Sequence, residues 1–207
     1  MNLKNAVSAM QKEHSKDTLT PLYTPWGEAI EKEQETNVLP EYPRPQLRRS
    51  NYQMLNGKWH YAINQNPAAS ETFSADGEIL VPFSPEALLS GVHRQVLPSD
   101  YLWYERRLTF SQEELSFLHQ GKHCLLHFGA IDQIAVIYIN GKEVASHVGG
   151  YLPFEVDITP YLTDSSVTLQ IRVQDYSDTS YYSRGKQTLK RGGMFYTAQS
   201  GIWQSVW

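Results

Sequence analysis

The sequence contains one cysteine and no long hydrophobic run. Cys124 has no second cysteine to join, so the fold does not depend on an oxidising compartment. The first seventeen residues are mostly polar and lack the apolar stretch of a secretory leader. No window reaches the length of a membrane span. These absences predict a cytoplasmic protein without a membrane partner.

An excess of positive charge is also missing. The 207 residues carry a formal net charge of −4, and Lys and Arg are dispersed along the chain. The one basic cluster, Arg44, Arg48 and Arg49, is short and has no aromatic residue between its members. Nucleic-acid binding requires a concentrated basic face. We therefore interpret the cluster as solvated surface and expect no nucleic-acid partner.

The sequence lacks the common cofactor and nucleophile signatures. It has no Walker loop, no dinucleotide fingerprint, no paired-cysteine motif and no Gly-x-Ser-x-Gly elbow. His119, His123 and His127 are spaced four apart, but Gly121 would interrupt a helix that aligned them. On a strand only His123 and His127 share a face, which favours a solvent-facing strand over a metal site. We expect no cofactor and no bound metal.

Aromatic residues and short alternating segments are what the sequence does have. Thirteen Tyr, seven Phe and five Trp suit both a β core and stacking against sugar rings. Between 167 and 173 the odd positions are apolar and the even ones polar, which predicts a half-buried strand. Asn140-Gly141 indicates a hairpin. Further strands are predicted at residues 58–63, 79–81, 103–110, 123–128, 133–139 and 143–145.

One short helix is predicted near residues 112–120. Ser111 and Glu114 fit a capping box, in which each side chain accepts a hydrogen bond from a free backbone amide. Gly121 would close the helix. Capping also accounts for the paired Glu113 and Glu114, so we do not interpret them as catalytic carboxylates. Many short strands with little helix predict an all-β sandwich.

Three regions are expected along the chain. Residues 1–20 are polar and are predicted to be mobile. Residues 21–50 contain five prolines, which remove backbone donors and favour an extended arm packed on the sandwich surface. A short helix through residues 28–33 remains possible within this arm. The sandwich domain is expected to span residues 51–207.

Four blocks of the sequence resemble the N-terminal, sugar-binding domain of glycoside hydrolase family 2. This family includes β-galactosidases, β-glucuronidases and β-mannosidases. The blocks occur in the family order, and together they span most of the chain. They lie at residues 41–47 with 55–59, 81–86 with 103–107, 127–132 with 139–142 and 147–159, and 174–178 with 199–207.

The resemblance implies a jelly-roll β-sandwich similar to galactose-binding domains, with one short helix and an extended N-terminal arm. It also implies a parent enzyme that retains configuration, using two glutamates on a later (β/α)₈ barrel reached through an immunoglobulin-like domain. No segment of this chain matches the barrel motifs. We therefore expect a fragment that carries no catalytic residue and is inactive alone.

Three functional hypotheses follow from the sequence. The leading one is an accessory domain of a hydrolase that cleaves β-linked glycosides, with carbohydrate as substrate and the immunoglobulin-like and barrel domains as partners. The alternatives are an autonomous carbohydrate-binding module and a structural domain for contacts between subunits. Many of the matching residues are explained by folding of the sandwich alone, because a fold does not fix a function.

The resemblance places two segments at the rim of the active site: the loop before Trp103 and residues 176–199. The second segment is long, polar and aromatic, and loops of that length are uncommon unless they are functional or disordered. An ordinary surface loop that packs on the barrel is an equally good interpretation. Family members often carry an acidic residue shortly before Ser200-Gly201-Ile202; here residues 195–199 contain none, so galactose specificity and bound sodium are not expected. The rim candidates are Asp100, Asp178, Tyr181, Tyr182, Arg184, Lys186 and Gln187.

Overall fold

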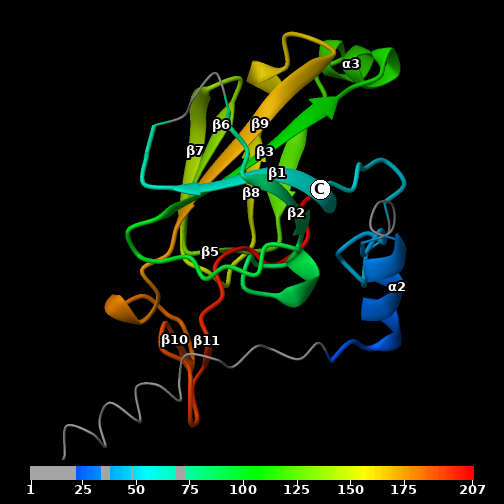
Figure 1. Cartoon of the computed structure of the whole chain (residues 1–207). Helices are drawn as coiled ribbons and strands as arrows, with labels where there is room; N and C mark the ends of the chain where they lie inside the picture. Colours follow the sequence, from blue (N-terminus) through cyan, green and yellow to red (C-terminus); the bar gives the residue numbers. More distant parts are fainter. Residues whose placement is uncertain (1–21, 34–37, 48, 69–72) are drawn as a thin grey trace, which may run out of the picture.

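The computed structural model describes residues 22–33, 38–47, 49–68 and 73–207. Its largest element is a six-stranded antiparallel sheet with the order β2-β1-β3-β9-β6-β7 (Figure 1). Its strands are β1 (Gly57–Asn64), β2 (Gly77–Val81), β3 (Tyr101–Thr109), β6 (Ile134–Ile139), β7 (Lys142–Val148) and β9 (Ser166–Gln174).

Shorter strands form the second layer. Antiparallel pairs join β4 to β8 and β5 to β12. The last residues extend this layer, because His127 and Trp207 exchange both backbone hydrogen bonds, at 2.8 and 3.1 Å. The strands are β4 (Leu125–Phe128), β5 (Ile131–Asp132), β8 (Phe154–Asp157) and β12 (Gly201–Ile202). The two layers make the all-β, jelly-roll sandwich that the sequence predicted.

The core lies between these layers. The odd positions of β9 from 167 to 173 are buried, as their alternation predicted. They pack in one cluster with Trp59 and Tyr104 from the large sheet and with Leu126 and Phe128 from the second layer. Burial of this apolar surface is the main force that holds the layers together.

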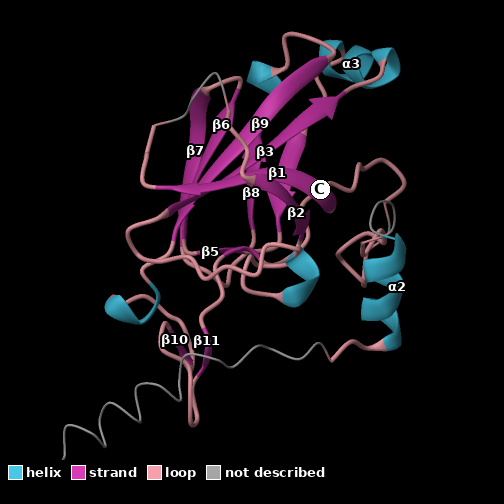
Figure 2. Cartoon of the chain, viewed as in Figure 1, coloured by secondary structure: helices cyan, strands magenta, loops and turns pink. Residues whose placement is uncertain are grey.

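Within the described residues, two α-helices accompany the sandwich, one more than the fold prediction counted (Figure 2). Helix α3 (Gln112–His119) is the predicted one. The Ser111 hydroxyl accepts from the Glu114 amide at 3.2 Å, and the Glu114 carboxylate accepts from the Ser111 amide at 2.7 Å. Gly121 follows with a φ of 78°, the left-handed conformation that commonly ends a helix.

Helix α2 (Pro25–Glu33) lies in the arm, where the sequence had left a short helix open. It begins at Pro25 rather than Glu28, because proline fits the first helical position, where its missing N–H has no partner to lose. The Thr24 hydroxyl accepts from the Gly27 amide at 3.1 Å and so caps the helix. The arm is therefore helical over nine residues instead of extended throughout.

The rest of the described arm contacts the sandwich. Asn56 donates its side-chain amide to the carbonyl oxygen of Val38 at 3.1 Å, and the Tyr42 ring packs edge-on against Trp207. The predicted mobility of residues 1–20 falls outside the described residues, and the boundary at residue 51 stays a prediction. No helix in the described part of the chain is long and apolar enough to cross a membrane.

Candidate functional site

Residues 176–199, here called the 176–199 loop, project from one end of the sandwich. The loop follows β9 of the large sheet and leads into β12 of the second layer. It contains a turn of 3₁₀ helix, η3 (Ser177–Thr179), and two short parallel strands, β10 (Gln187–Thr188) and β11 (Tyr196–Thr197). Figure 1 shows it in orange to red, at the end of the sandwich opposite α3.

Three of the predicted rim residues stabilise the loop itself. The Asp178 carboxylate accepts from the Leu189 amide at 3.1 Å, and the Gln187 side-chain carbonyl accepts from the Gln199 amide at 2.6 Å. Arg184 donates to the carbonyl oxygen of Ser180 at 3.1 Å. These contacts explain how an irregular segment keeps a defined shape, because each satisfies a backbone group that has no strand or helix partner.

Tyr181 and Lys186 are exposed to solvent, whereas Tyr182 is half-buried. Tyr181 is 90% exposed, and its ring centroid lies 4.7 Å from that of Tyr182. Lys186 is exposed as well. Exposed aromatic faces beside polar groups can stack against a sugar ring or against apolar side chains of a protein. Of the predicted set, Tyr181 and Lys186 are the two exposed members.

Asp100 precedes β3, and the structure buries it. Its carboxylate accepts from the Leu97 amide at 3.2 Å and lies 3.8 Å from Arg94. Its segment is tied to the 176–199 loop through Gln95, which donates to the carbonyl oxygen of Leu189 at 3.0 Å. The structure thus brings the two predicted segments together, although the Asp100 side chain faces its own turn.

Two aromatic residues that the sequence analysis did not select complete this end of the molecule. The Tyr151 and Trp203 rings meet edge-on with centroids 6.0 Å apart, and Trp203 donates to the carbonyl oxygen of Gly150 at 2.8 Å. The Tyr151 hydroxyl also hydrogen-bonds the Gln187 side chain. The Gly149-Gly150-Tyr151 and Gly201-Ile202-Trp203 runs were the available signal, because a glycine beside an aromatic marks a close backbone approach.

Buried carboxyl groups lie at the base of the loop. Burial raises the pKa of Asp132 to about 7, with further contributions from Asp175 and Glu86. The pKa of Glu86 also rises to about 7 because of burial, although its hydrogen bonds with Val96 and Ser200 oppose the rise. The pKa of Asp175 is raised by burial as well. The end of the sandwich from which the loop starts therefore contains three weakly solvated carboxyl groups.

Some buried polar groups at this end of the sandwich lack a hydrogen-bond partner. One carboxylate oxygen of Asp132, the side-chain nitrogen of Gln133 and the hydroxyl of Ser177 are buried and have no partner among the described residues. Gln133 reaches the loop through its other end, since its side-chain oxygen accepts from the Tyr176 amide at 3.4 Å. Buried polar groups of this kind are usually bridged by ordered water.

The loop does not carry the carboxylate pair that retaining hydrolysis uses. Retaining hydrolysis requires two carboxylates about 5 Å apart that flank the glycosidic bond. The 176–199 loop contains one carboxylate, Asp178, and it accepts a backbone hydrogen bond. Within the described residues, no three His, Cys, Asp or Glu side chains gather as metal ligands. The loop offers aromatic faces and cations instead.

His123 and His127, which were predicted to share a solvent-facing strand surface, differ in exposure. The side chain of His123 is 65% exposed and lies 2.6 Å from the Asp157 carboxylate. His127 is only 22% exposed, because its ring stacks on Trp207 at 5.0 Å. The solvent-facing interpretation is therefore correct for His123, whereas His127 is largely covered. Burial accordingly lowers the pKa of His127.

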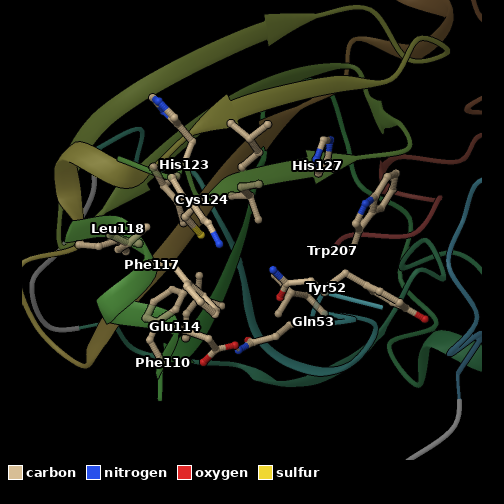
Figure 3. A pocket seen from close by; sticks show the side chains of 18 of the residues that line it. Tyr52, Gln53, Phe110, Glu114, Phe117, Leu118, His123, Cys124, His127 and Trp207 are labelled. Atoms are coloured by element: carbon tan, nitrogen blue, oxygen red, sulfur yellow. The ribbon is translucent and has the colours of Figure 1, made fainter. Parts of the chain in front are cut away.

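A hollow of about 240 Å³ lies at the other end of the sandwich, beside α3 (Figure 3). Its lining is mostly apolar and includes Phe110, Phe117 and the single cysteine. Gln53 and Glu114, joined by a 2.7 Å hydrogen bond, supply polar groups to its wall. Burial raises the pKa of the Cys124 thiol to about 11, so the thiol stays protonated at neutral pH.

Comparison with known families decides the affiliation. Residues 92–207 match the model of the glycosyl hydrolases family 2 sugar binding domain, which is more than half of the chain. The chain belongs to glycosyl hydrolase family 2. The matched region contains the Tyr151 and Trp203 pair and the whole 176–199 loop. The family predicted from the four sequence blocks is thereby confirmed for the part of the chain from residue 92.

Individual family 2 relatives agree with this placement. A β-galactosidase of Thermoanaerobacter pseudethanolicus is 30% identical over 128 residues, which is 59% of this chain and 16% of that protein. A β-glucuronidase of Felis catus is 41% identical over 59 residues, or 28% of this chain and 9% of that protein. The solved Lactobacillus rhamnosus β-glucuronidase superposes with a TM-score of 0.56 and 26% identity, over 74% of this chain and 27% of that one. This chain therefore spans a minor part of its relatives' length.

Proposed function

We propose that this chain is the accessory sugar-binding domain of a larger, configuration-retaining hydrolase that acts on β-linked glycosides in the cytoplasm. The match of residues 92–207 to the family 2 sugar-binding domain carries the proposal. Relatives named β-galactosidase and β-glucuronidase support the reaction class. The single cysteine supports a reducing compartment. The polypeptide of 207 residues is inactive in this proposal, because catalysis belongs to a barrel in the parent.

The 176–199 loop is the part through which this domain serves the active site. Its exposed side chains, Tyr181 and Lys186 above all, are free to contact substrate or the catalytic domain. Its internal hydrogen bonds hold the loop backbone that carries these side chains before any contact is made, which lowers the entropy cost of binding. Asp100, Asp178, Arg184 and Gln187 then act by shaping this part of the surface, and Tyr182 supports Tyr181.

Steady-state kinetics of the full-length parent test this assignment. Tyr181→Ala and Lys186→Ala should each lower kcat/KM by about tenfold, which corresponds to about 1.4 kcal/mol of lost transition-state binding. Lys142→Ala is the matched control, since Lys142 is an exposed lysine in β7, on the β6–β7 hairpin. Its kinetics should equal those of the wild type. If both loop variants behaved like this control, with unchanged thermal stability, the loop would not belong to the site.

A binding measurement on the isolated chain distinguishes the accessory domain from an autonomous module. An autonomous module binds sugar without help from other domains, so the chain of 207 residues would bind an oligosaccharide tightly. The accessory domain should instead contribute binding only within the parent. Calorimetry with the isolated chain distinguishes the two, and tight binding would replace the present proposal with the autonomous module.

A further inference from the structure

The hollow beside α3 is large enough to hold a small organic molecule. Protein interiors are packed as closely as organic crystals, with few voids larger than a water molecule. This hollow measures about 240 Å³, whereas an apolar cavity of about 150 Å³ in another protein binds benzene. Exposed Arg49, Asn51 and Lys122 belong to its lining, so it opens to solvent. It therefore has room, and a way in, for a benzene ring with two small substituents.

The wall of the hollow favours an aromatic body. Phe117 comes from α3, Leu126 from β4 and Ile158 from the segment after β8. Phe110 adds a second ring to the lining. The Phe117 ring already receives a group on its face, because the Lys122 nitrogen lies 4.1 Å from its centroid. Aromatic rings pack well edge-on or offset against such rings.

Glu114 supplies a charged hydrogen-bond acceptor on one side of the hollow. Its carboxylate accepts from the Ser111 amide and from the Gln53 side chain, both at 2.7 Å. The bond from the Ser111 backbone, with help from Gln53, lowers the pKa of Glu114, so the group is ionised at neutral pH. Each carboxylate oxygen can accept a second hydrogen bond. A hydroxyl group on a ligand would therefore meet a strong acceptor here.

Trp207 supplies an unused donor on another side. The residue is only 6% exposed, and its indole nitrogen is buried without a hydrogen-bond partner among the described residues. By contrast, the indoles of Trp59, Trp103 and Trp203 each donate to a backbone carbonyl oxygen. A buried donor that lacks a partner is unfavourable. Trp207 and Glu114 both line the hollow, and Figure 3 shows them on different sides of it.

We propose that this hollow binds a small, neutral aromatic molecule that carries a hydroxyl group at one end and a hydrogen-bond acceptor at the other. The hydroxyl donates to Glu114, the acceptor receives the Trp207 N–H, and the ring packs beside Phe117. Charge favours a neutral molecule, because Glu114 repels an anion whereas Arg49 and Lys122 repel a cation. The site is separate from the proposed function, since it lies at the end of the sandwich opposite the 176–199 loop.

Binding of 4-hydroxyacetophenone to the chain of 207 residues tests the proposal. At about pH 6 its hydroxyl group is protonated, and we expect a dissociation constant of about 0.1 mM by calorimetry. Two matched probes each lack one polar group: 4-methylacetophenone lacks the hydroxyl, and 4-ethylphenol lacks the carbonyl. Each should bind about tenfold more weakly, because each leaves one polar group of the wall without its new partner.

Nuclear magnetic resonance locates the bound probe. The indole N–H signal of Trp207, identified by its absence in Trp207→Phe, should shift when 4-hydroxyacetophenone is added. The indole signals of Trp103 and Trp203 should stay in place, because neither residue lines the hollow. Trp207→Phe should bind 4-hydroxyacetophenone about tenfold more weakly but 4-ethylphenol about as well as the wild type. A shift at Trp203 instead of Trp207 would overturn the site.

Glu114→Gln separates a ligand contact from a change in the wall. Glutamine also fits the third position of a capping box, so α3 should keep its start. The variant should lose about tenfold in affinity for 4-hydroxyacetophenone and nothing for 4-methylacetophenone, which has no hydroxyl to donate. Glu113→Gln is the matched control, because Glu113 is an exposed neighbour that does not line the hollow. Equal losses for both probes in Glu114→Gln would overturn the assigned contact.

Other occupants of the hollow give different results. Tighter binding of 4-ethylbenzoate than of 4-hydroxyacetophenone would overturn the neutral ligand and assign an anion held by Arg49 and Lys122. Binding seen only after removal of residues 1–21 would assign the hollow to that segment. Binding that weakens as protein concentration rises would assign it to a second copy of the chain. No saturable binding up to about 5 mM, equivalent to less than the expected affinity by more than tenfold, would overturn the small-molecule site.

Discussion

A carboxylate oxygen of Asp132 occupies the position that a β carbon would take on Gly150. Asp132 lies in β5, beneath the loop end of the domain, and Gly150 lies in the turn that carries Tyr151. The Gly149 amide holds this turn in place by donating to the carbonyl oxygen of Gln133 at 2.8 Å. Trp203 strengthens the arrangement by donating to the carbonyl oxygen of Gly150. Glycine is required at this position because of space.

Gly150→Ala should therefore destabilise the domain by about 1–3 kcal/mol, the usual cost of forcing extra atoms into a packed site. Chemical denaturation of the isolated chain measures this loss. Gly27→Ala, inside α2, is the control: its new methyl group would meet Tyr23 at an ordinary 3.4 Å and should not destabilise the domain. Equal stability of the Gly150 variant and the wild type would show that Asp132 moves aside freely.

Stability should fall as pH rises from about 4 to about 7. The pKa of Asp132 is about 7 in the folded chain against an ordinary value of 3.8, so the folded state holds a proton that the unfolded state has released. Between these two pKa values, each rise in pH therefore disfavours the folded state, by at most about 1.4 kcal/mol per pH unit for one group. Glu86, whose pKa is also raised to about 7, contributes in the same direction.

Asp132→Asn should make that pH dependence shallower, because the amide cannot ionise. Unfolding free energies measured across the pH range for both proteins give the two slopes. The remaining slope should come from Glu86 and Asp175, whose pKa values are raised as well. An identical slope in the variant would mean that Asp132 ionises as it does in water.

Removal of the Tyr104 hydroxyl should be costly although it removes only one atom. The backbone amide of Ile202 donates to this hydroxyl at 3.1 Å, and both residues are fully buried. Tyr104→Phe leaves that amide without a partner, so we expect a loss of about 1–3 kcal/mol in unfolding free energy. Tyr61→Phe is the control, since the described residues offer its hydroxyl no hydrogen bond. Similar losses in the two variants would contradict this account.

The isolated chain should not hydrolyse nitrophenyl β-galactoside, β-glucuronide or β-mannoside, and it should bind free monosaccharides weakly. The loop exposes its aromatic faces and so buries little of a small sugar, which leaves the lost translational and rotational freedom uncompensated. We expect dissociation constants no lower than about 1 mM, equivalent to about −4 kcal/mol. An activity assay against a no-enzyme control tests the first expectation, and calorimetry tests the second. Turnover that co-purifies with the chain would refute the first.

The sequence was informative where structure depends on local pattern. Alternation from 167 to 173 predicted β9 because side chains of a strand point to opposite faces in turn. The Ser111 and Glu114 pair predicted the start of α3 because capping involves residues three positions apart. The start of α2 was predicted too late, since Pro25 was treated as a helix breaker when it fits the first helical position.

The candidate site was less predictable because it depends on contacts between distant segments. Asp132, Asp175 and Glu86 come from separate parts of the chain, and no local pattern indicates that they share a buried region. Tyr151 and Trp203 were missed for the same reason. Asp178 and Gln187, two of the predicted rim candidates, both accept backbone hydrogen bonds within the loop, and their place at a substrate rim stays a prediction. Polar residues in an irregular segment often stabilise its turns in this way.

The 176–199 loop leaves one sheet of the sandwich and returns to the other, and among the described strands its two short ones pair with each other alone. Its length and sequence can therefore change through evolution without altering the register of any core strand. Exchange of this loop between family members should transfer contact properties while the host retains its fold. Under the proposed function, the core strands thus form a scaffold on which the contacts made by the loop can change.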